Sequence, residues 1–143
     1  MLKDKLCTNE KRNVVIMDCV TLIEKIIASQ KGLSGIATKS VYKLIKSTKP
    51  NSVYHSVDHM LEEFVDHLDP FYASATKNHA DIVEYFTNHR EAIAESLIEI
   101  ADNHAQSIKN RILHQGYTRM RSNAQKHVEE AVPDIAALIK RHV

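Results

Sequence analysis

The scarcity of glycine and proline constrains this chain more than any other feature. The 143 residues contain three glycines and three prolines, so few positions can form the tight turns that a small all-β fold needs. Most of these six residues are separated by long stretches that contain neither type. They are Gly32, Gly35, Pro50, Pro70, Gly116 and Pro133. The chain therefore favours long helices joined by few turns.

Apolar residues recur at helical spacing along most of the chain. The stretch 12–29 carries an apolar stripe broad enough to be covered by more than one neighbouring helix. Gly32 is expected to cap this helix, Gly116 to close a later one, and Asp69-Pro70 to start a new turn or short helix. The other predicted helices span 35–48, 51–68, Asn78 to Phe86, 89–115 and 118 to the end of the chain.

The last apolar stripe keeps its helical phase from Tyr117 to Val143, through Pro133. We therefore expect one helix that is kinked at Pro133 rather than broken there. The predicted fold class is all-α, a compact single-domain bundle of five to seven helices over residues 1–143. Residues 1–11 are a candidate for a loosely held N-terminal segment.

Composition and charge exclude several classes of protein. With 43% hydrophobic residues and a net charge of +1, the chain is neither disordered nor a nucleic-acid binder that works through global charge. No apolar stretch is long enough for a transmembrane helix, and the N-terminus lacks the apolar segment of a signal peptide. Cys7 and Cys19 form no CxxC motif or disulfide framework. We expect a soluble protein in the cytoplasm.

Two histidines on the predicted helix 51–68 are candidate metal ligands. His55 and His59 lie one turn apart, and such a pair can place two imidazoles on one divalent ion. They fall opposite the apolar stripe, where a charged and solvated face is the alternative interpretation. A metal site inside a bundle needs inward-facing ligands from several helices. We therefore keep His55 and His59 as surface candidates and predict no cofactor.

Three polar residues lie on otherwise apolar stripes of the last two predicted helices. His104 is expected to be a core histidine bonded to a carbonyl or hydroxyl group, with a ligand or pH-sensitive role as the alternative. Arg121, near Tyr117, either extends to water or pairs with an acid of a neighbouring helix, such as Glu99. If His104, Tyr117 and Arg121 converge, they form an anion or ligand pocket.

Five lysines with no arginine among them form a basic patch: Lys31, Lys39, Lys43, Lys46 and Lys49. An ordinary solvated helix face is the alternative to a patch that binds nucleic acid, acidic lipid headgroups or an acidic protein surface. Because residues 58–69 are rich in acids, a symmetric dimer that joins the two faces is a further alternative.

Catalytic motifs are absent: no P-loop, Gly-x-Ser-x-Gly or His-Glu-x-x-His sequence occurs. An anion could bind near Ser34 and Gly35, where the helix predicted at 35–48 begins and presents free backbone N–H groups. A nucleophilic role for Ser34 is disfavoured, because the flanking glycines serve a turn and no adjacent base is implied. We therefore lean against an enzyme.

The sequence resembles a bacterial family of small proteins known only as a domain of unknown function. The resemblance rests on Gly-Leu-Ser-Gly-x-Ala-x-Lys at 32–39, on Phe64-Val65-Asp66 ahead of Pro70-Phe71, and on 122–129 ahead of Pro133. It implies an all-helical single domain and supplies no catalytic residues.

The function that best fits these observations is non-enzymatic: contact with a protein partner, or self-association. The first alternative is a bundle that binds a ligand, anion or metal near His104 and Arg121. The second is contact with phosphate or nucleic acid through the patch Lys31–Lys49, although the net charge disfavours nucleic acid.

Overall fold

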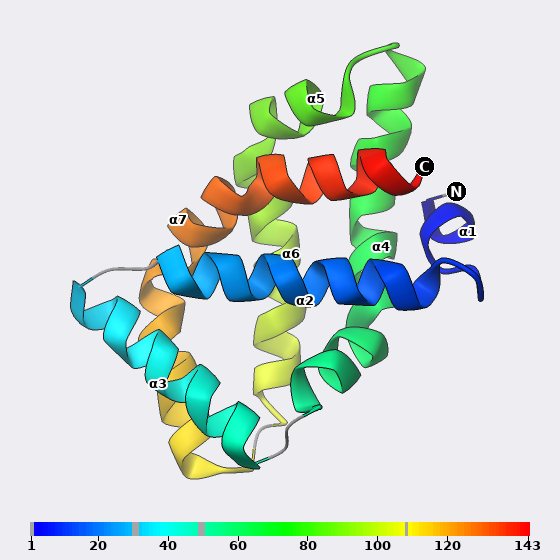
Figure 1. The fold of residues 1–143 in the computed structure, drawn as a ribbon. Helices are drawn as coiled ribbons and strands as arrows, with labels where there is room; N and C mark the ends of the chain where they lie inside the picture. Colours follow the sequence, from blue (N-terminus) through cyan, green and yellow to red (C-terminus); the bar gives the residue numbers. More distant parts are fainter. Residues whose placement is uncertain (1, 30–31, 49–50, 108) are drawn as a thin grey trace.

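The structure, a computed structural model, is built from helices alone in the part of the chain that it describes (Figure 1). It describes residues 2–29, 32–48, 51–107 and 109–143, apart from some side chains within the third and last helices. These residues form α1 (Leu2–Leu6), α2 (Arg12–Ser29), α3 (Gly32–Thr48), α4 (Ser52–Lys77), α5 (Ile82–Asn88), α6 (Arg90–Ala105) and α7 (Arg111–His142). The all-α prediction of five to seven helices is confirmed.

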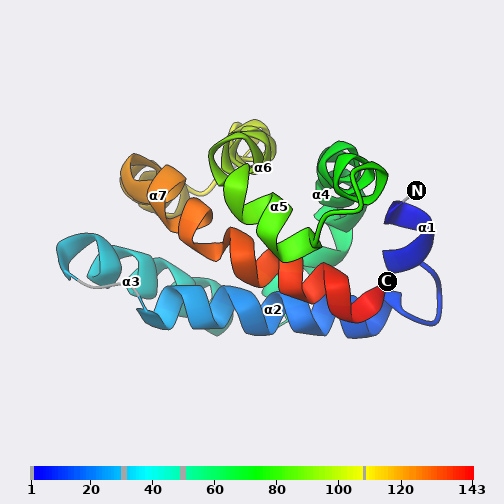
Figure 2. The ribbon, with the colours of Figure 1, turned by 90° about the horizontal axis from the view of Figure 1, so that it is seen from above.

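The helices form two layers that α7 connects. The long helices α4 and α6 lie side by side in one layer, and α2 and α3 form the other (Figures 1 and 2). The helix α7 packs against α6 and α5 and also against α2 and α3. Within the described residues, no helix combines the length and apolar character needed to cross a membrane.

One core joins both layers at the end of the molecule that holds α1, α5 and the C-terminal part of α7. Its largest fully buried side chains are Phe86, Leu2, Ile16, Ile93, Ile100, Ile139, Val15 and Val132. The N-terminal segment belongs to this core, because Leu2 and Leu6 are buried and the Leu2 amide donates to Asp69 Oδ1 at 2.6 Å. Burial of these side chains supplies the main free energy that holds the two layers together.

The helix α7 changes direction in its orange part and still runs unbroken through Pro133 (Figure 1). Proline has no N–H and its ring clashes with the preceding turn, so a bend N-terminal to Pro133 is the expected result. The predicted kinked helix is confirmed, and the bend carries α7 from one part of the bundle to another.

The prediction that Asp69-Pro70 starts a new element is wrong, because α4 continues to Lys77. Buried side chains keep their helical spacing across this point: Val65, Leu68, Tyr72 and Ala75. Pro70 and Asp66 are exposed, so water can satisfy the Asp66 carbonyl that loses its helical partner. Packing of the buried face therefore outweighs the cost of the proline.

The prediction that one helix spans 89–115 and ends at Gly116 is also wrong. The chain leaves the helix after Ala105 and starts α7 at Arg111, so Gly116 is a buried residue inside α7. The Asn110 side chain accepts a hydrogen bond from the Ile112 amide at 3.0 Å, which satisfies a free N–H of the first turn. A polar cap without glycine or proline therefore marks this boundary.

Two further boundaries differ in detail from the prediction. Gly32 has φ of 74°, the left-handed conformation expected of it, but α3 begins there rather than at residue 35. The short helix α5 is capped by Asp81, which accepts from the Glu84 amide at 3.1 Å, and not by Asn78.

Candidate functional site

A pocket of about 340 Å³ lies between α2, α4, α6 and α7. Most side chains that line it are apolar: Ile23, Ile26, Phe64, Leu97, Ile98, Ala101, Ala124, Val128, Ala131 and Ile135. The polar lining residues are Tyr117, Arg121, Asn123 and His127. Volume and lining match the general pattern of small-molecule sites, which are mostly apolar with a few polar groups and measure about 300–1,000 Å³.

The polar side of the pocket is held by three side chains from α6 and α7. The Tyr117 hydroxyl donates to Asp102 Oδ1 at 2.5 Å. Arg121 Nε donates to both oxygens of the same carboxylate, at 2.9 and 3.1 Å. Charge-assisted bonds of this kind fix both partners in place. The acid that pairs with Arg121 is therefore Asp102 and not the suggested Glu99, which lies three residues earlier.

The pKa values of this cluster follow from the same contacts. The hydrogen bond from Tyr117, and then that from Arg121, lowers the pKa of Asp102. Burial first, and then the Asp102 carboxylate, raises the pKa of Tyr117 far above its usual value. At neutral pH the tyrosine therefore keeps its proton and Asp102 stays ionised, so the arrangement does not change through the physiological range.

His104 lies in a neighbouring hollow rather than in the core. Its Nε2 is 2.8 Å from Glu63 Oε2, its side chain is 36% exposed, and the ring of His59 meets its ring edge-on at 6.1 Å. The expected carbonyl or hydroxyl partner is thus a carboxylate. Tyr117 lines both this hollow and the apolar pocket. The predicted convergence is therefore partial, since His104 and Arg121 line different hollows on either side of Tyr117.

The two metal candidates, His55 and His59, are both exposed on α4, as the sequence predicts. His55 packs against Tyr54, and His59 against His104. Among the residues that the structure describes, no group of three or more His, Cys, Asp or Glu side chains is placed to hold a metal ion. The geometry therefore gives this pair no third ligand, and the apolar pocket is the better-formed site.

A comparison with models of protein families shows which family the chain is related to. The model of a family of unknown function, DUF6918, matches residues 2–143. The chain belongs to the DUF6918 family. Neither the curated proteins nor the solved structures give a match. This result agrees with the predicted resemblance. The matched region includes all residues that line the pocket, but the DUF6918 family is assigned no activity.

The Gly-Leu-Ser-Gly element of this DUF6918 chain is helical rather than a loop. It forms the first turn of α3, and Gly35 is buried there. The side chain of Ser34 lies outside the described part of the structure. Burial of Gly35 does not favour the anion site predicted at this point.

The lysine patch divides into paired and unpaired residues. Lys46 lies 4.0 Å from Glu24 on α2 and over the Tyr42 ring. Lys39 and Lys43 are exposed, with no acid of the described chain within ion-pair distance. Lys31 and Lys49 lie outside the described residues. The available positive charge of the described patch is therefore concentrated at Lys39 and Lys43.

Sequence reasoning missed Asp102, the residue that joins Tyr117 to Arg121. A usable signal was present, because Tyr117 and Arg121 lie one turn apart on an apolar stripe and a cation there needs a nearby acid. Asp102 follows Ile98 by one turn on α6, next to the buried face of that helix. The spacing could have singled out Asp102 ahead of Glu99.

Proposed function

We propose that this protein binds a small amphiphilic molecule, with an aliphatic body and one anionic group, in the pocket between α2, α4, α6 and α7. The observation that carries the proposal is the pairing of an apolar lining with an oriented guanidinium at its polar side. Leu97 and Ile98 are buried, whereas Arg121 is exposed. A bound molecule could therefore place its apolar part inward and its polar group near water.

The charge of the lining favours an anion over a cation. No acid is found among the described residues that line the pocket, and Arg121 supplies a permanent positive charge. Asp102 orients the guanidinium and pairs with its charge, and Glu95 and Glu99 line the adjacent hollow together with Arg121. A ligand carboxylate would therefore share Arg121 with Asp102, and the preference for an anion should be moderate rather than absolute.

The test is a titration of the purified protein with unbranched carboxylates of increasing length, followed by calorimetry. Primary amines of the same length are the headgroup control. We expect carboxylates to bind about tenfold more tightly than the amines, which corresponds to about 1.4 kcal/mol. Arg121→Met should remove most of that difference, because it keeps the apolar stem and deletes the charge.

Ala101→Phe tests whether the ligand occupies this pocket, since Ala101 lines it from α6. The added ring should fill the space and abolish binding with little loss of stability. Ala28→Phe, on the exposed side of α2, is the matched control and should bind as the wild type does. Carboxylate binding that survives Ala101→Phe, or no binding at millimolar concentration, would refute the proposal.

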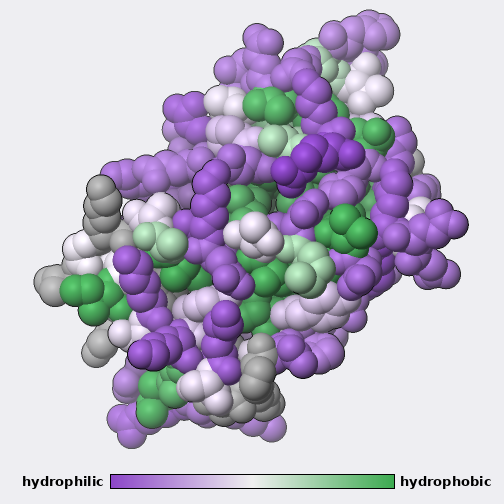
Figure 3. Space-filling model, in the orientation of Figure 1, coloured by the Kyte–Doolittle hydropathy of each residue, from purple (hydrophilic) through white to green (hydrophobic). Residues whose placement is uncertain are grey.

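A second candidate function is self-association through the outer side of α2, which the exposure of Val14 and Met17 supports. Each is 51% exposed, and they lie three residues apart on one helix. Apolar side chains also reach the surface between charged ones on this face of the molecule (Figure 3). Exposed apolar residues that share a face are typical of contact surfaces.

The acids of α4 are less suited to join two copies than the sequence suggested. Arg12 already pairs with Asp58 at 2.8 Å and with Glu62 at 3.2 Å, and His104 contacts Glu63. The charge that this face offers to the lysines of a second copy is therefore reduced. Light scattering should detect a dimer that Met17→Glu dissociates and Ala28→Glu does not. A wild-type protein that stays monomeric at high concentration would count against this candidate.

A further inference from the structure

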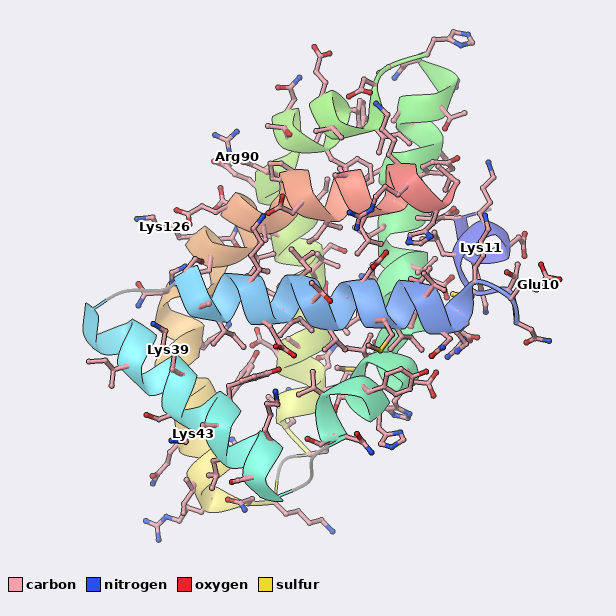
Figure 4. The ribbon with its side chains drawn as sticks, in the orientation of Figure 1. Glu10, Lys11, Lys39, Lys43, Arg90 and Lys126 are labelled. Atoms are coloured by element: carbon pink, nitrogen blue, oxygen red, sulfur yellow. The ribbon has the colours of Figure 1, made fainter. Side chains whose placement is uncertain are left out.

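We propose that the outer face of α3 docks the protein on an anionic membrane surface. This face is formed by the exposed residues of the helix, of which Ile36, Lys39 and Lys43 carry the argument. Their spacing of three and four places them along one side of α3. Lys39 and Lys43 point away from the bundle at the edge that α3 forms (Figure 4).

The two lysines have charge to offer because nothing in the described chain neutralises it. Several other basic residues of the described chain are paired with acids, such as Lys140 with Asp81 at 2.7 Å and Lys25 with Asp134 at 3.5 Å. No acid of the described chain lies within 4.0 Å of Lys39 or Lys43. A lysine near an anionic lipid surface contributes about 1 kcal/mol to binding. Two lysines without acidic partners on one face can therefore contribute about 2 kcal/mol to membrane binding.

Two more exposed cations lie on the same side of the molecule in the view of Figure 4. Lys126 on α7 and Arg90 at the start of α6 are exposed, and in Figure 4 they lie above Lys39 on the left of the view, with Lys126 nearer to it than Arg90. Glu129 and Glu130 line the same shallow hollow as these two residues and offset part of their charge. The docking argument therefore rests on Lys39 and Lys43, which have no such acids beside them in the described chain.

Ile36 distinguishes a membrane from a nucleic acid as the anionic partner. It is 64% exposed and lies three residues from Lys39. An aliphatic side chain among lysines gains free energy when it enters the boundary between headgroups and acyl chains, whereas a phosphate backbone offers it no apolar contact. The helix contains no arginine to read a base edge. Its one aromatic residue, Tyr42, is partly buried beside Lys46 and does not form an open stacking surface.

The position of α3 relates this surface to the rest of the molecule. The helix packs against α7, which supplies much of the lining of the apolar pocket. Docking through α3 would hold that pocket close to the lipid surface. The docking surface does not rest on the proposed ligand, because Ile36, Lys39 and Lys43 are not among the lining residues described for the pocket. Failure of one proposal is therefore distinguishable from failure of the other.

The experiment is co-sedimentation of the whole chain with vesicles of phosphatidylcholine that contain phosphatidylglycerol, compared with vesicles of phosphatidylcholine alone. We expect binding to the anionic vesicles only, weakened as the salt approaches about 1 M, where the Debye length falls to about 3 Å. Lys39→Gln with Lys43→Gln should lower the affinity about 25-fold, or about fivefold for each lysine. Lys77→Gln, an exposed lysine at the end of α4, is the control and should have no effect.

Ile36→Ser separates the two kinds of anionic partner. It should weaken vesicle binding severalfold, and Val143→Ser, which changes an exposed apolar residue just beyond α7, should not. Thermal unfolding of each variant establishes that the fold is retained. The proposal is overturned if the wild type binds neither vesicle, binds both equally, or binds an oligonucleotide in a way that the lysine variants abolish and Ile36→Ser leaves unchanged.

Discussion

The two ends of this bundle differ in how closely their side chains are packed. The closed end contains α1, α5 and residues 131–142 of α7, and the open end contains α3 and residues 111–128 of α7. Five of the α7 residues at the closed end are buried: Ala131, Val132, Ala136, Leu138 and Ile139. Of the described α7 residues at the open end, Gly116 alone is buried. A single helix thus serves as a core element at one end and as a pocket wall at the other.

This difference indicates which parts of the molecule hold the fold and which are available for contacts. The closed end buries large side chains such as Phe86 and Leu2 completely. The apolar pocket borders the open end, which also keeps Lys39 and Lys43 without acids in the described chain. Dense packing leaves no room for a ligand, so a site is expected where packing is incomplete.

The largest expected effect comes from a matched pair of phenylalanines. Phe86→Ala, which empties a fully buried site at the closed end, should lower the free energy of unfolding by about 3–5 kcal/mol. Phe64→Ala should cost about 2 kcal/mol or less, because Phe64 is only partly buried and lines a space that already exists. Urea unfolding measures both values. Equal losses would remove the distinction between the two ends.

A smaller effect is expected from Asp102→Asn near the open end. The variant keeps the shape but loses the charge that Arg121 and Tyr117 contact, and should cost about 1 kcal/mol or less because the pair is partly exposed to solvent. The pKa of Asp102 is lowered in the folded state. Its contribution is therefore complete above the usual aspartate pKa of about 4 and is lost as the pH falls through the folded value.

Unfolding of the wild type and of Asp102→Asn at neutral and acidic pH tests this assignment. The difference in stability between the two proteins should be present at pH 7 and shrink in acid. Glu10→Gln, which removes a carboxylate at an exposed position, is a control that should change stability little. A difference that persists unchanged in acid would mean that Asp102 acts through shape rather than through charge.

The smallest effect concerns the two thiols, where the fold is expected to change the rate of alkylation and not the stability of the protein. Burial, and then the nearby Asp18 carboxylate, raises the pKa of Cys19 to about 11, and burial also raises the pKa of Cys7. At pH 8 only about a thousandth of Cys19 is thiolate. Alkylation should therefore be slow in the folded protein and fast in urea. Cys7→Ser isolates Cys19, and rapid native-state alkylation of this variant would show that the packing around α2 opens readily.

Periodicity predicted the helices well where apolar residues repeat. The prediction failed where a proline or glycine suggested a helix end but tertiary packing kept the helix continuous. Pro70 looked like a boundary, but the buried faces on either side of it are in phase, and packing kept α4 continuous. Gly116 looked like a helix end, whereas Asn110 marks the real start of α7 with a side-chain cap. Helix ends depend on both local capping and tertiary packing, and sequence spacing reports only the first.

The site was less accessible to sequence reasoning than the fold. Tyr117 and Arg121 could be selected because they are polar residues on an apolar stripe. The pocket itself could not be predicted, because spacing tells which side chains face inward and not whether they fill the space between helices. The same limit applies to Lys39 and Lys43, whose lack of acidic partners depends on the placement of α3 relative to α2 and α7.

The way in which the end of α7 covers α2 has a consequence for how the chain reaches its folded state during synthesis. Lys11 donates to the His142 carbonyl at 2.6 Å, and His142 contacts Asp18 at 2.6 Å, so nearly the whole chain separates these partners. Synthesis delivers α2 before the end of α7. On the ribosome, α3 and α4 can pack against α2, but the contacts of α2 with the end of α7 form only after residues 131–142 have been made. Final assembly is therefore expected after synthesis of α7, and until then α2 is a surface on which a chaperone could act.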